Sequence, residues 1–162
     1  MTDTPKDRIS NPTKLRSGVK ILDIDHYAPF LLNAVSNAWQ RKTSAMYRKE
    51  FDLGIVEWRV IAMLNIEPEI TAHRICEVIR LDKAAVSRSL KLLNQRGLVG
   101  FEALTSDPRK RRWWLTESGR AIHAEIMEIA LRSEGEMLAG VPPEDLEVFL
   151  AVIRRMLTNI DP

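Results

Sequence analysis

The sequence predicts a mainly α-helical chain with one small β-hairpin, and three observations lead to this fold class. Apolar residues recur at spacings of three and four along most of the chain, as on the buried side of a helix. The period changes only over "GLVGFEALTSDPRKRRWWLT", where two short extended runs flank a polar Asp-Pro segment, as in a hairpin. With 162 residues and 45% hydrophobic content, the chain can form one core or two small lobes that share elements.

The composition predicts a cytoplasmic protein. The single cysteine, Cys76, cannot form an internal disulfide, and the N-terminal residues do not resemble a secretory signal. No apolar run approaches the roughly 20 residues that a bilayer span requires, so no membrane contact is expected. Cys76 lies between Ile75 and Ile79 on an inward helix face, which favours a core residue over a redox sensor.

The chain is expected to begin with an arm and a long helix. Residues 1–20 are polar and charged, with two prolines and a glycine, and have too few apolar side chains to offset the entropy of ordering them. We interpret them as a flexible arm. Asp23 or Asp25 is the candidate cap of the helix, Pro29 is tolerated in its first turn, and the apolar spacing continues to about Phe51.

Three shorter helices are expected next. The first begins at about Gly54 and ends near Pro68, Thr71 is the candidate cap of the second, and the third lies between Asp82 and Gly97. Glycine suits the left-handed position that ends a helix. The third helix has an apolar side of Val86, Leu90 and Leu93 and an opposite side of Ala84, Ser87, Arg88, Lys91 and Gln95.

The hairpin and two further helices complete the predicted order. Adjacent side chains of a strand point to opposite faces, so Trp113 should face the core together with Leu115, while Trp114 is more exposed. Thr116 is the candidate cap of a helix that runs to about Leu138, and a final helix follows. The middle of the chain is therefore a helix-turn-helix followed by a wing.

The charges indicate a polyanion as partner. Between Lys83 and Arg112 there are eight basic and two acidic residues, a net charge of +6, whereas the whole chain carries +2. The second helix of a helix-turn-helix lies in the DNA major groove, so double-stranded DNA is the expected partner. The candidate recognition-helix contacts are Lys83, Ala84, Ala85, Ser87, Arg88 and Lys91.

Each of these residue types suits a different contact. The short side chains of Ala84 and Ala85 allow close approach and can touch a thymine methyl group. Arg88 has the shape to grip guanine through two hydrogen bonds, and Lys91, one turn further on, is better placed for a phosphate. A following hairpin lies near the adjacent minor groove, where the negative potential attracts arginine. The candidate wing residues are Asp107, Arg109, Lys110, Arg111 and Arg112.

The stretch "LDKAAVSRSLKLLNQRGLV", followed by Asp-Pro-Arg at 107–109 and by "LTESG", resembles the winged helix of the multiple-antibiotic-resistance regulator (MarR) family. In that family an Asp-x-Arg pattern in the wing precedes Leu-Thr-x-x-Gly. The resemblance covers about residues 25–160 and implies that Arg109 enters the minor groove while Asp107 orients it. Arg111 and Arg112 depart from the family, which more often has apolar strand residues there.

The resemblance also implies a homodimer and a ligand. It places a helical dimerisation region at residues 21–52 and 117–162, around a winged helix-turn-helix domain at 53–116. Two recognition helices would then read half-sites of an inverted repeat roughly 34 Å apart. The family's effector pocket lies between the two parts, and a small aromatic or amphipathic acid is the expected effector. The candidate pocket residues are Tyr27, Phe30, Trp39 and Trp58, although aromatic residues at helical spacing are more often part of the core.

The predicted function is that of a sequence-specific DNA-binding transcription regulator, a ligand-responsive repressor. The alternative is a winged-helix protein-interaction module that uses the same basic face on an acidic partner. No enzyme and no cofactor are expected, because the sequence has no glycine-rich phosphate loop, nucleophile elbow or paired-carboxylate arrangement. No metal is expected either, since His26, His73 and His123 lack ligand spacing.

Overall fold

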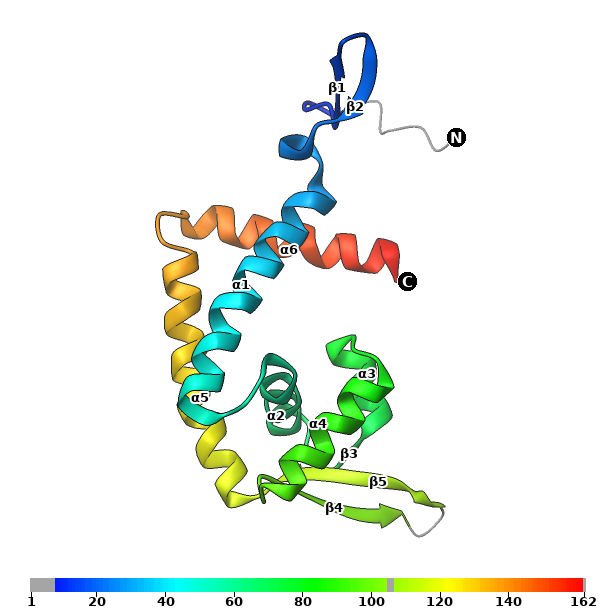
Figure 1. Cartoon of the computed structure of the whole chain (residues 1–162), viewed down its shortest axis with the longest axis vertical. Coiled ribbons are helices and arrows are strands. Elements are labelled where there is room, and N and C mark those ends of the chain that lie inside the picture. Colours follow the sequence, from blue (N-terminus) through cyan, green and yellow to red (C-terminus); the bar gives the residue numbers. More distant parts are fainter. Residues whose placement is uncertain (1–7, 105–106, 162) are drawn as a thin grey trace.

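The computed structural model describes residues 8–104 and 107–161; of Leu104, Pro108 and Arg109 the backbone alone is described. Figure 1 shows an elongated molecule in which two long helices, α1 and α5, connect a winged part at one end to a hairpin and a last helix at the other. The predicted fold class, mainly α with a small β-hairpin wing, is confirmed.

The N-terminal hairpin is formed by β1 (Thr13–Arg16) and β2 (Val19–Leu22), which pair antiparallel. Ser17 and Gly18 both have positive φ values, 51° and 79°, and such a turn matches the twist of two-stranded hairpins. The polar composition of residues 1–20 predicts a flexible arm, whereas the structure has a hairpin over residues 13–22. The Ser17-Gly18 turn accounts for the difference, because its two positive φ values allow the strands to pair although they bury no apolar face.

The first long helix begins later than its expected caps. A short 3₁₀ turn, Ile24–His26, precedes α1 (Ala28–Phe51), which has Pro29 in its first turn and ends where predicted. Its N-cap residue is Tyr27. The Asp23 carboxylate instead accepts a hydrogen bond from Lys14 Nζ at 3.0 Å and lies 3.0 Å from His26 Nδ1. Asp23 therefore links β1 to the 3₁₀ turn that precedes α1.

The helix-turn-helix follows the predicted order, and its elements are α2 (Ile55–Ile66), β3 (Ile70–Thr71), α3 (Ala72–Ile79) and α4 (Lys83–Gln95). The predicted cap Thr71 is confirmed, and Asp82, after which the next helix was expected to begin, is the cap of α4. The Thr71 hydroxyl accepts a hydrogen bond from the backbone N–H of Arg74, and the Asp82 carboxylate accepts one from that of Ala85. Gly97, with φ of 70°, occupies the left-handed position after α4.

The remaining elements are β4 (Val99–Leu104), β5 (Asp107–Leu115), α5 (Glu117–Met137) and α6 (Pro143–Ile160). The strands form an antiparallel sheet in the order β3-β5-β4. Two residues are too few to show an alternating pattern, so β3 was not predicted. β5 begins at Asp107, before the expected run "RRWWLT", and the ladder shifts register between Ala103 and Leu104.

The hydrophobic core lies where α2, α3, α4, β5 and the lower parts of α1 and α5 meet. Trp113 and Leu115 are buried, as the strand alternation predicted. Thr116 joins the sheet to α5, since its hydroxyl donates to Gly97 O at 2.7 Å and accepts from Gly119 N at 3.0 Å. The core thus holds α4 and the hairpin in fixed relation.

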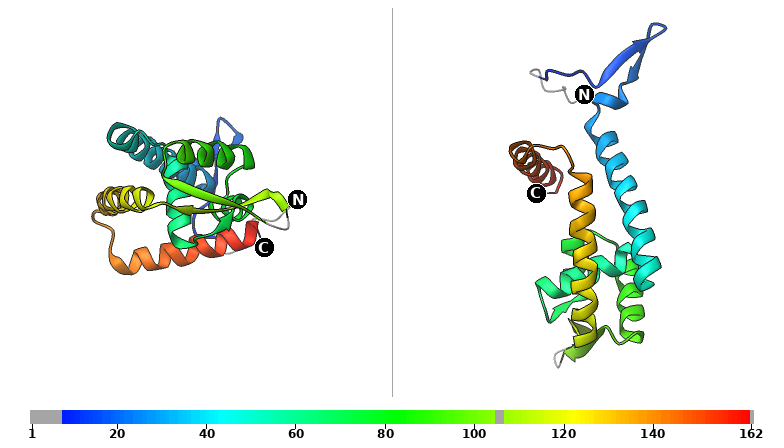
Figure 2. Two further views of the ribbon diagram at one scale, coloured as in Figure 1. Left: turned by 90° about the horizontal axis from the view of Figure 1, so that it is seen from below. Right: turned by 90° about the vertical axis from the view of Figure 1, so that its left-hand side faces the viewer.

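The last helix is the exception to this burial. Figure 2 shows α6 beside the far end of α5. Asp161, directly after α6, forms an ion pair with Arg80 at the end of α3. It buries none of its residues completely, and the large apolar side chains that it exposes are Val148, Phe149, Val152, Leu157 and Ile160. None of the described helices is long and apolar enough to cross a membrane.

Candidate nucleic-acid interface

The outer face of α4 carries the residues that the sequence analysis selected. Lys83, Ala84, Ser87, Arg88 and Lys91 are exposed and Ala85 is half-buried, so the structure brings these six together along one side of the helix. The other side, with Val86, Leu90 and Leu93, is buried in the core. A helix fixed in this way presents a basic and small-residue surface to solvent.

Two polar residues at the end of α4 fix the angle between this helix and the hairpin. Asn94 Nδ2 donates to Val99 O at 2.9 Å. The Arg96 guanidinium donates to the backbone oxygens of Asp52, at 2.7 Å, and Phe51, at 2.9 Å. Arg96 counted toward the basic charge of this region, but its hydrogen bonds tie α4 to the junction of α1 and α2. Sequence reasoning did not detect either role.

The wing residues lie on β5 rather than on an irregular tip. Lys110, Arg111 and Arg112 are exposed, and Asp107 is half-buried and takes part in further interactions. Arg111 is paired with Ala103 in the ladder, while Arg112 lies opposite Glu102 on one side and Thr71 on the other. These two arginines are therefore strand residues. The side chain of Arg109 lies outside the described part of the chain.

An aromatic side chain in β4 positions one of these arginines. The Arg111 guanidinium carbon lies 4.1 Å from the centre of the Phe101 ring, and that ring packs on Trp113 with centroids 4.9 Å apart. Phe101 is 37% exposed, so this stack extends the core to the surface of the wing. The sequence signal that could have identified this role is the alternation in "GLVGFEAL", which places Phe101 on one face of a strand that pairs with the strand of Trp113.

The second tryptophan covers a glycine on the neighbouring strand. A Cβ atom on Gly100 would lie 2.8 Å from Trp114 Nε1, so the indole rests directly on the backbone of β4. Trp114 is half-buried, whereas Trp113 is buried. The two tryptophans thus fix both faces at the base of the hairpin, and they hold the basic residues beyond them at the end of the molecule that carries α4 (Figure 1).

The four candidate pocket residues do not form one cluster in this chain. Phe30 and Trp39 are separated by nine residues of α1, or about 13 Å along the helix. Phe30 is exposed, and Tyr27 and Trp39 are half-buried. Trp58 packs between Tyr47, at a centroid distance of 6.1 Å, and His123, at 5.4 Å. The structure thus places Trp58 in the packing that joins α1, α2 and α5.

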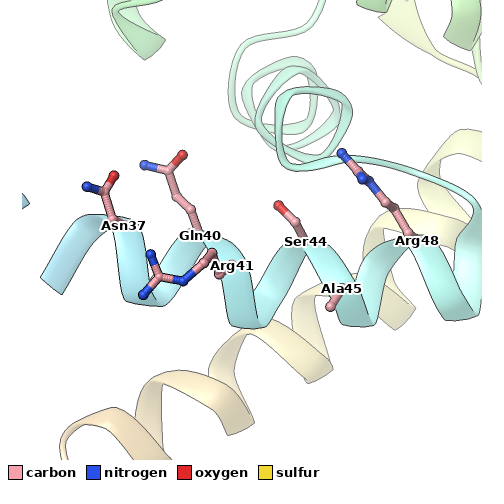
Figure 3. A pocket seen from close by; sticks show the side chains of 6 residues that line it. All are labelled: Asn37, Gln40, Arg41, Ser44, Ala45 and Arg48. Carbon is pink, nitrogen blue, oxygen red and sulfur yellow. The ribbon is translucent and has the colours of Figure 1, made fainter. Parts of the chain in front are cut away.

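A polar groove of about 460 Å³ lies along the middle of α1. Figure 3 shows its six lining side chains, all from α1, with Arg48 reaching toward α2. Two of the six, Arg41 and Arg48, are cationic. The other four are Asn37, Gln40, Ser44 and Ala45.

The other candidate chemistry is confined to the core or absent from the described residues. Cys76 is half-buried and packs against the core, as expected for an inward position. Burial lowers the pKa of His123 below its ordinary value. Among residues 8–104 and 107–161, no group of three or more His, Cys, Asp or Glu side chains is arranged to hold a metal ion.

Comparison with known proteins supports this geometry. A model of the MarR family matches residues 51–112, which include α2, α3, α4, β4 and most of β5. A MarR/EmrR family transcriptional regulator from Acinetobacter sp. ADP1 is 26% identical, with a TM-score of 0.79. The match covers 86% of this chain and 99% of that one.

Two more distant structures share the fold. The PcaV transcriptional regulator from Streptomyces coelicolor, solved in complex with its natural ligand, is 20% identical over 87% of this chain and 99% of that chain, with a TM-score of 0.74. MepR from S. aureus, solved in a complex with DNA, is 18% identical over 85% of this chain and 99% of that chain, also with a TM-score of 0.74.

Proposed function

We propose that this chain, which belongs to the MarR family of transcription regulators, is a homodimeric repressor that binds an inverted-repeat operator and is released by a small acid. The observation that carries the proposal is the shared placement of α4 and the basic hairpin at one end of the molecule. Occupancy of the operator would exclude the polymerase. The DNA complex of MepR, which shares the fold, supports DNA as the partner.

The positions of the basic residues on this surface suggest which part of the DNA each of them contacts. Arg88 lies on the exposed side of α4, where a guanidinium can pair with a guanine in the major groove. Arg112 projects from the opposite face of β5 to Arg111, since side chains alternate along the paired part of the strand, and Lys110 is exposed next to Arg111. With Arg109 of the Asp-Pro-Arg segment, they are suited to phosphates and the minor groove.

The proposed dimer is supported by apolar surface that a single subunit leaves uncovered. Exposed apolar side chains lie on α6 and on the N-terminal half of α1, including Phe149, Val152, Phe30 and Val35. Contiguous apolar patches of this kind mark interaction surfaces, and a two-fold dimer would cover both copies. Association through these helices would leave the recognition helices free for the two half-sites.

The effector is proposed to be a carboxylic acid with an aromatic or amphipathic body. Arg41 and Arg48 supply cations in the groove of α1, close to the helices that support both the dimer and the winged part. Planar guanidinium groups pair well with carboxylates. The ligand complex of PcaV, which shares the fold, supports a small-molecule ligand. To release DNA, the acid must bind more tightly to the form whose recognition helices do not match the operator.

The proposal is tested by selecting bound fragments from a random duplex library with the purified protein at two salt concentrations. Recovery of one inverted repeat, with affinity falling by orders of magnitude between low and moderate salt, is the expected result. Salt-sensitive binding without an enriched sequence would contradict operator recognition and favour the protein-interaction module. The recovered fragment is then the probe for release by aromatic acids, with an Arg41→Ala and Arg48→Ala variant as comparison.

A further inference from the structure

The N-terminal hairpin is strongly basic, and part of this charge is unused. Residues 8–22 contain four basic side chains and no acidic one. Arg8 donates to the backbone oxygen of His26, and Lys14 is paired with Asp23. Arg16 and Lys20 are exposed and form no ion pair or side-chain hydrogen bond with any described residue. The hairpin therefore offers two free cations.

The same hairpin exposes apolar side chains that a soluble subunit would be expected to cover. Leu15 is 75% exposed, Val19 63% and Leu22 43%. Among the described elements, each strand packs extensively only on the other. An isolated two-stranded hairpin is at best marginally stable in water. A further surface would therefore stabilise this hairpin.

The DNA surface of the same subunit is too far away to be that surface. Figure 1 places the hairpin at the opposite end of the molecule from α4 and the wing. The 24 residues of α1 lie between them, which is about 36 Å of helix. An acidic surface that pairs with the cations of the hairpin must therefore lie near their own end of the molecule.

Such a surface lies at the turn between α5 and α6. Residues 133–153 contain five acidic side chains and no lysine or arginine. Glu136 is paired with Lys42, and the remaining four have no ion-pair partner in the described part of the chain. We name this segment the acidic corner, and its acidic residues, all exposed, are Glu134, Glu136, Glu144, Asp145 and Glu147.

Apolar side chains adjoin the acidic corner as they adjoin the cations of the hairpin. Val141 and Val148 are 44% and 62% exposed. The two surfaces therefore carry opposite charges, and both expose apolar side chains. Within one subunit they stand apart, since the hairpin projects beyond the start of α1 and the corner lies at the end of α5 (Figure 2).

We propose that the N-terminal hairpin of each subunit docks on the acidic corner of a second copy of this chain. The inference rests on the proposed homodimer and adds to it a clamp outside the α1 and α6 helices. A two-fold axis makes the contact reciprocal, so each ion pair and apolar contact occurs twice per dimer. The free cations are Arg16 and Lys20, and their counterparts are Glu144 and Glu147.

The test is a charge swap in the full chain, with the dimer dissociation constant measured by sedimentation equilibrium at low salt. Arg16→Glu with Lys20→Glu is expected to raise the constant about tenfold, because two attractive contacts per subunit become repulsive. Glu144→Lys with Glu147→Lys should have the same effect. Combining all four substitutions should restore a constant near that of the unmodified protein.

A matched control changes the same charge at the other end of the molecule. Arg88→Glu with Lys91→Glu should abolish DNA binding and leave the dimer constant unchanged, because these residues lie on α4. Far-UV circular dichroism confirms that each variant is folded. High salt should reduce the differences among the hairpin variants, since exposed charges are screened.

The outcomes separate this inference from the proposed function. A monomeric unmodified protein would contradict the homodimer itself. A dimer whose constant is unaffected by the Arg16 and Lys20 reversals would overturn the clamp alone. If each pair of reversals weakens the dimer but the variant with all four substitutions does not recover the original dissociation constant, the hairpin does not pair with the acidic corner. Loss of DNA affinity in a hairpin variant cross-linked as a dimer would instead place the hairpin on DNA and overturn docking on the partner.

Discussion

The winged part and the terminal part of this molecule differ in how far one chain completes them. In the winged part, apolar residues of α2, α3, α4 and the sheet form one closed core, and side chains cap both α3 and α4. In the terminal part, α6 buries no residue completely, and the N-terminal hairpin has exposed apolar side chains. The first region closes its own core, whereas the second leaves apolar side chains exposed.

The difference predicts that substitutions in the two regions affect different measurements. A change inside the winged part should alter the free energy of unfolding, because its contacts form within one subunit. A change on α6 should alter association and leave the winged part folded.

Gly119→Ala should produce the largest loss of stability. A Cβ atom at this position would lie 2.0 Å from the backbone oxygen of Leu98, which cannot move without displacing the hairpin from α5. We expect the free energy of unfolding to fall by about 3 kcal/mol, measured by denaturant titration of tryptophan fluorescence.

A glycine of the same helix supplies the control. Gly135 has no atom within 4 Å of its would-be Cβ, so Gly135→Ala should raise stability by about 0.5–1 kcal/mol through helix propensity. Equal effects of the two alanines would show that α5 does not press on Leu98 as described. The winged part would then be less tightly packed at Leu98 than its buried contacts indicate.

Phe149→Asp should weaken the proposed dimer by about 2 kcal/mol, which is a loss of roughly thirtyfold in association. Phe149 is 51% exposed in the single subunit and lies among the other apolar residues of α6. Sedimentation equilibrium measures the effect. Thr158→Asp is the control, because nine residues further along a helix the side chain points to the opposite side.

The Phe149→Asp variant should keep the unfolding transition of the winged part unchanged when it is followed by denaturant titration. A variant that still dimerises normally would remove α6 from the interface. A variant that loses the core of α2 to α4 would contradict the independence of the two regions. The first result would mean that α6 is not part of the interface, and the second that the two regions do not fold independently.

How much of the fold the sequence could predict follows the same division. Thr71 and Thr116 were predictable as caps because a threonine before an apolar helical pattern favours this role. In the structure both, and Asp82 as well, accept a hydrogen bond from the backbone N–H three residues further on. The N-terminal hairpin was not predicted, because its apolar residues are exposed and provide no pattern of burial. Only the Ser17-Gly18 turn indicated it, and a two-residue signal is weak beside the polar composition around it.

The candidate site shows a similar limit. The exposed side of α4 follows from helical spacing alone, so its six residues were predictable. The contact of Arg111 with Phe101 depends on the strand register, in which Trp113 lies opposite Phe101 and the ladder shifts at Ala103. Register is set by packing against the core and by the bulge, which no local pattern reveals.

Arg88→Ala should reduce discrimination among operator variants by about 1–3 kcal/mol, because its guanidinium is placed to read a base. The measurement is a set of binding titrations with single-base operator variants. Arg154→Ala is the control, since this exposed arginine lies on α6 and on neither α4 nor the wing. Unchanged discrimination in the Arg88 variant would assign that residue to phosphate contact, which lowers affinity for all sequences alike.

The smallest expected effect lies at the junction of the two regions, where His123 of α5 stacks on Trp58 of α2. Burial lowers the pKa of His123, so the unfolded chain binds a proton more readily than the folded chain. Stability should therefore fall as the pH decreases from about 6.5 toward the folded-state pKa. The pKa of the Glu67 carboxyl is lowered by its ion pair with Arg74, and its contribution to stability is lost only in more acidic solution.

Thermal unfolding between pH 7 and pH 5 measures this slope, and His123→Phe should flatten it while preserving the ring contact with Trp58. The control is His73→Phe, because the His73 side chain is exposed on α3. An unchanged slope in the His123 variant would show that another group titrates there. A flattened slope, with unchanged dimerisation, would show that the junction belongs to the folding unit of the winged part and that the boundary between the regions lies higher on α1 and α5.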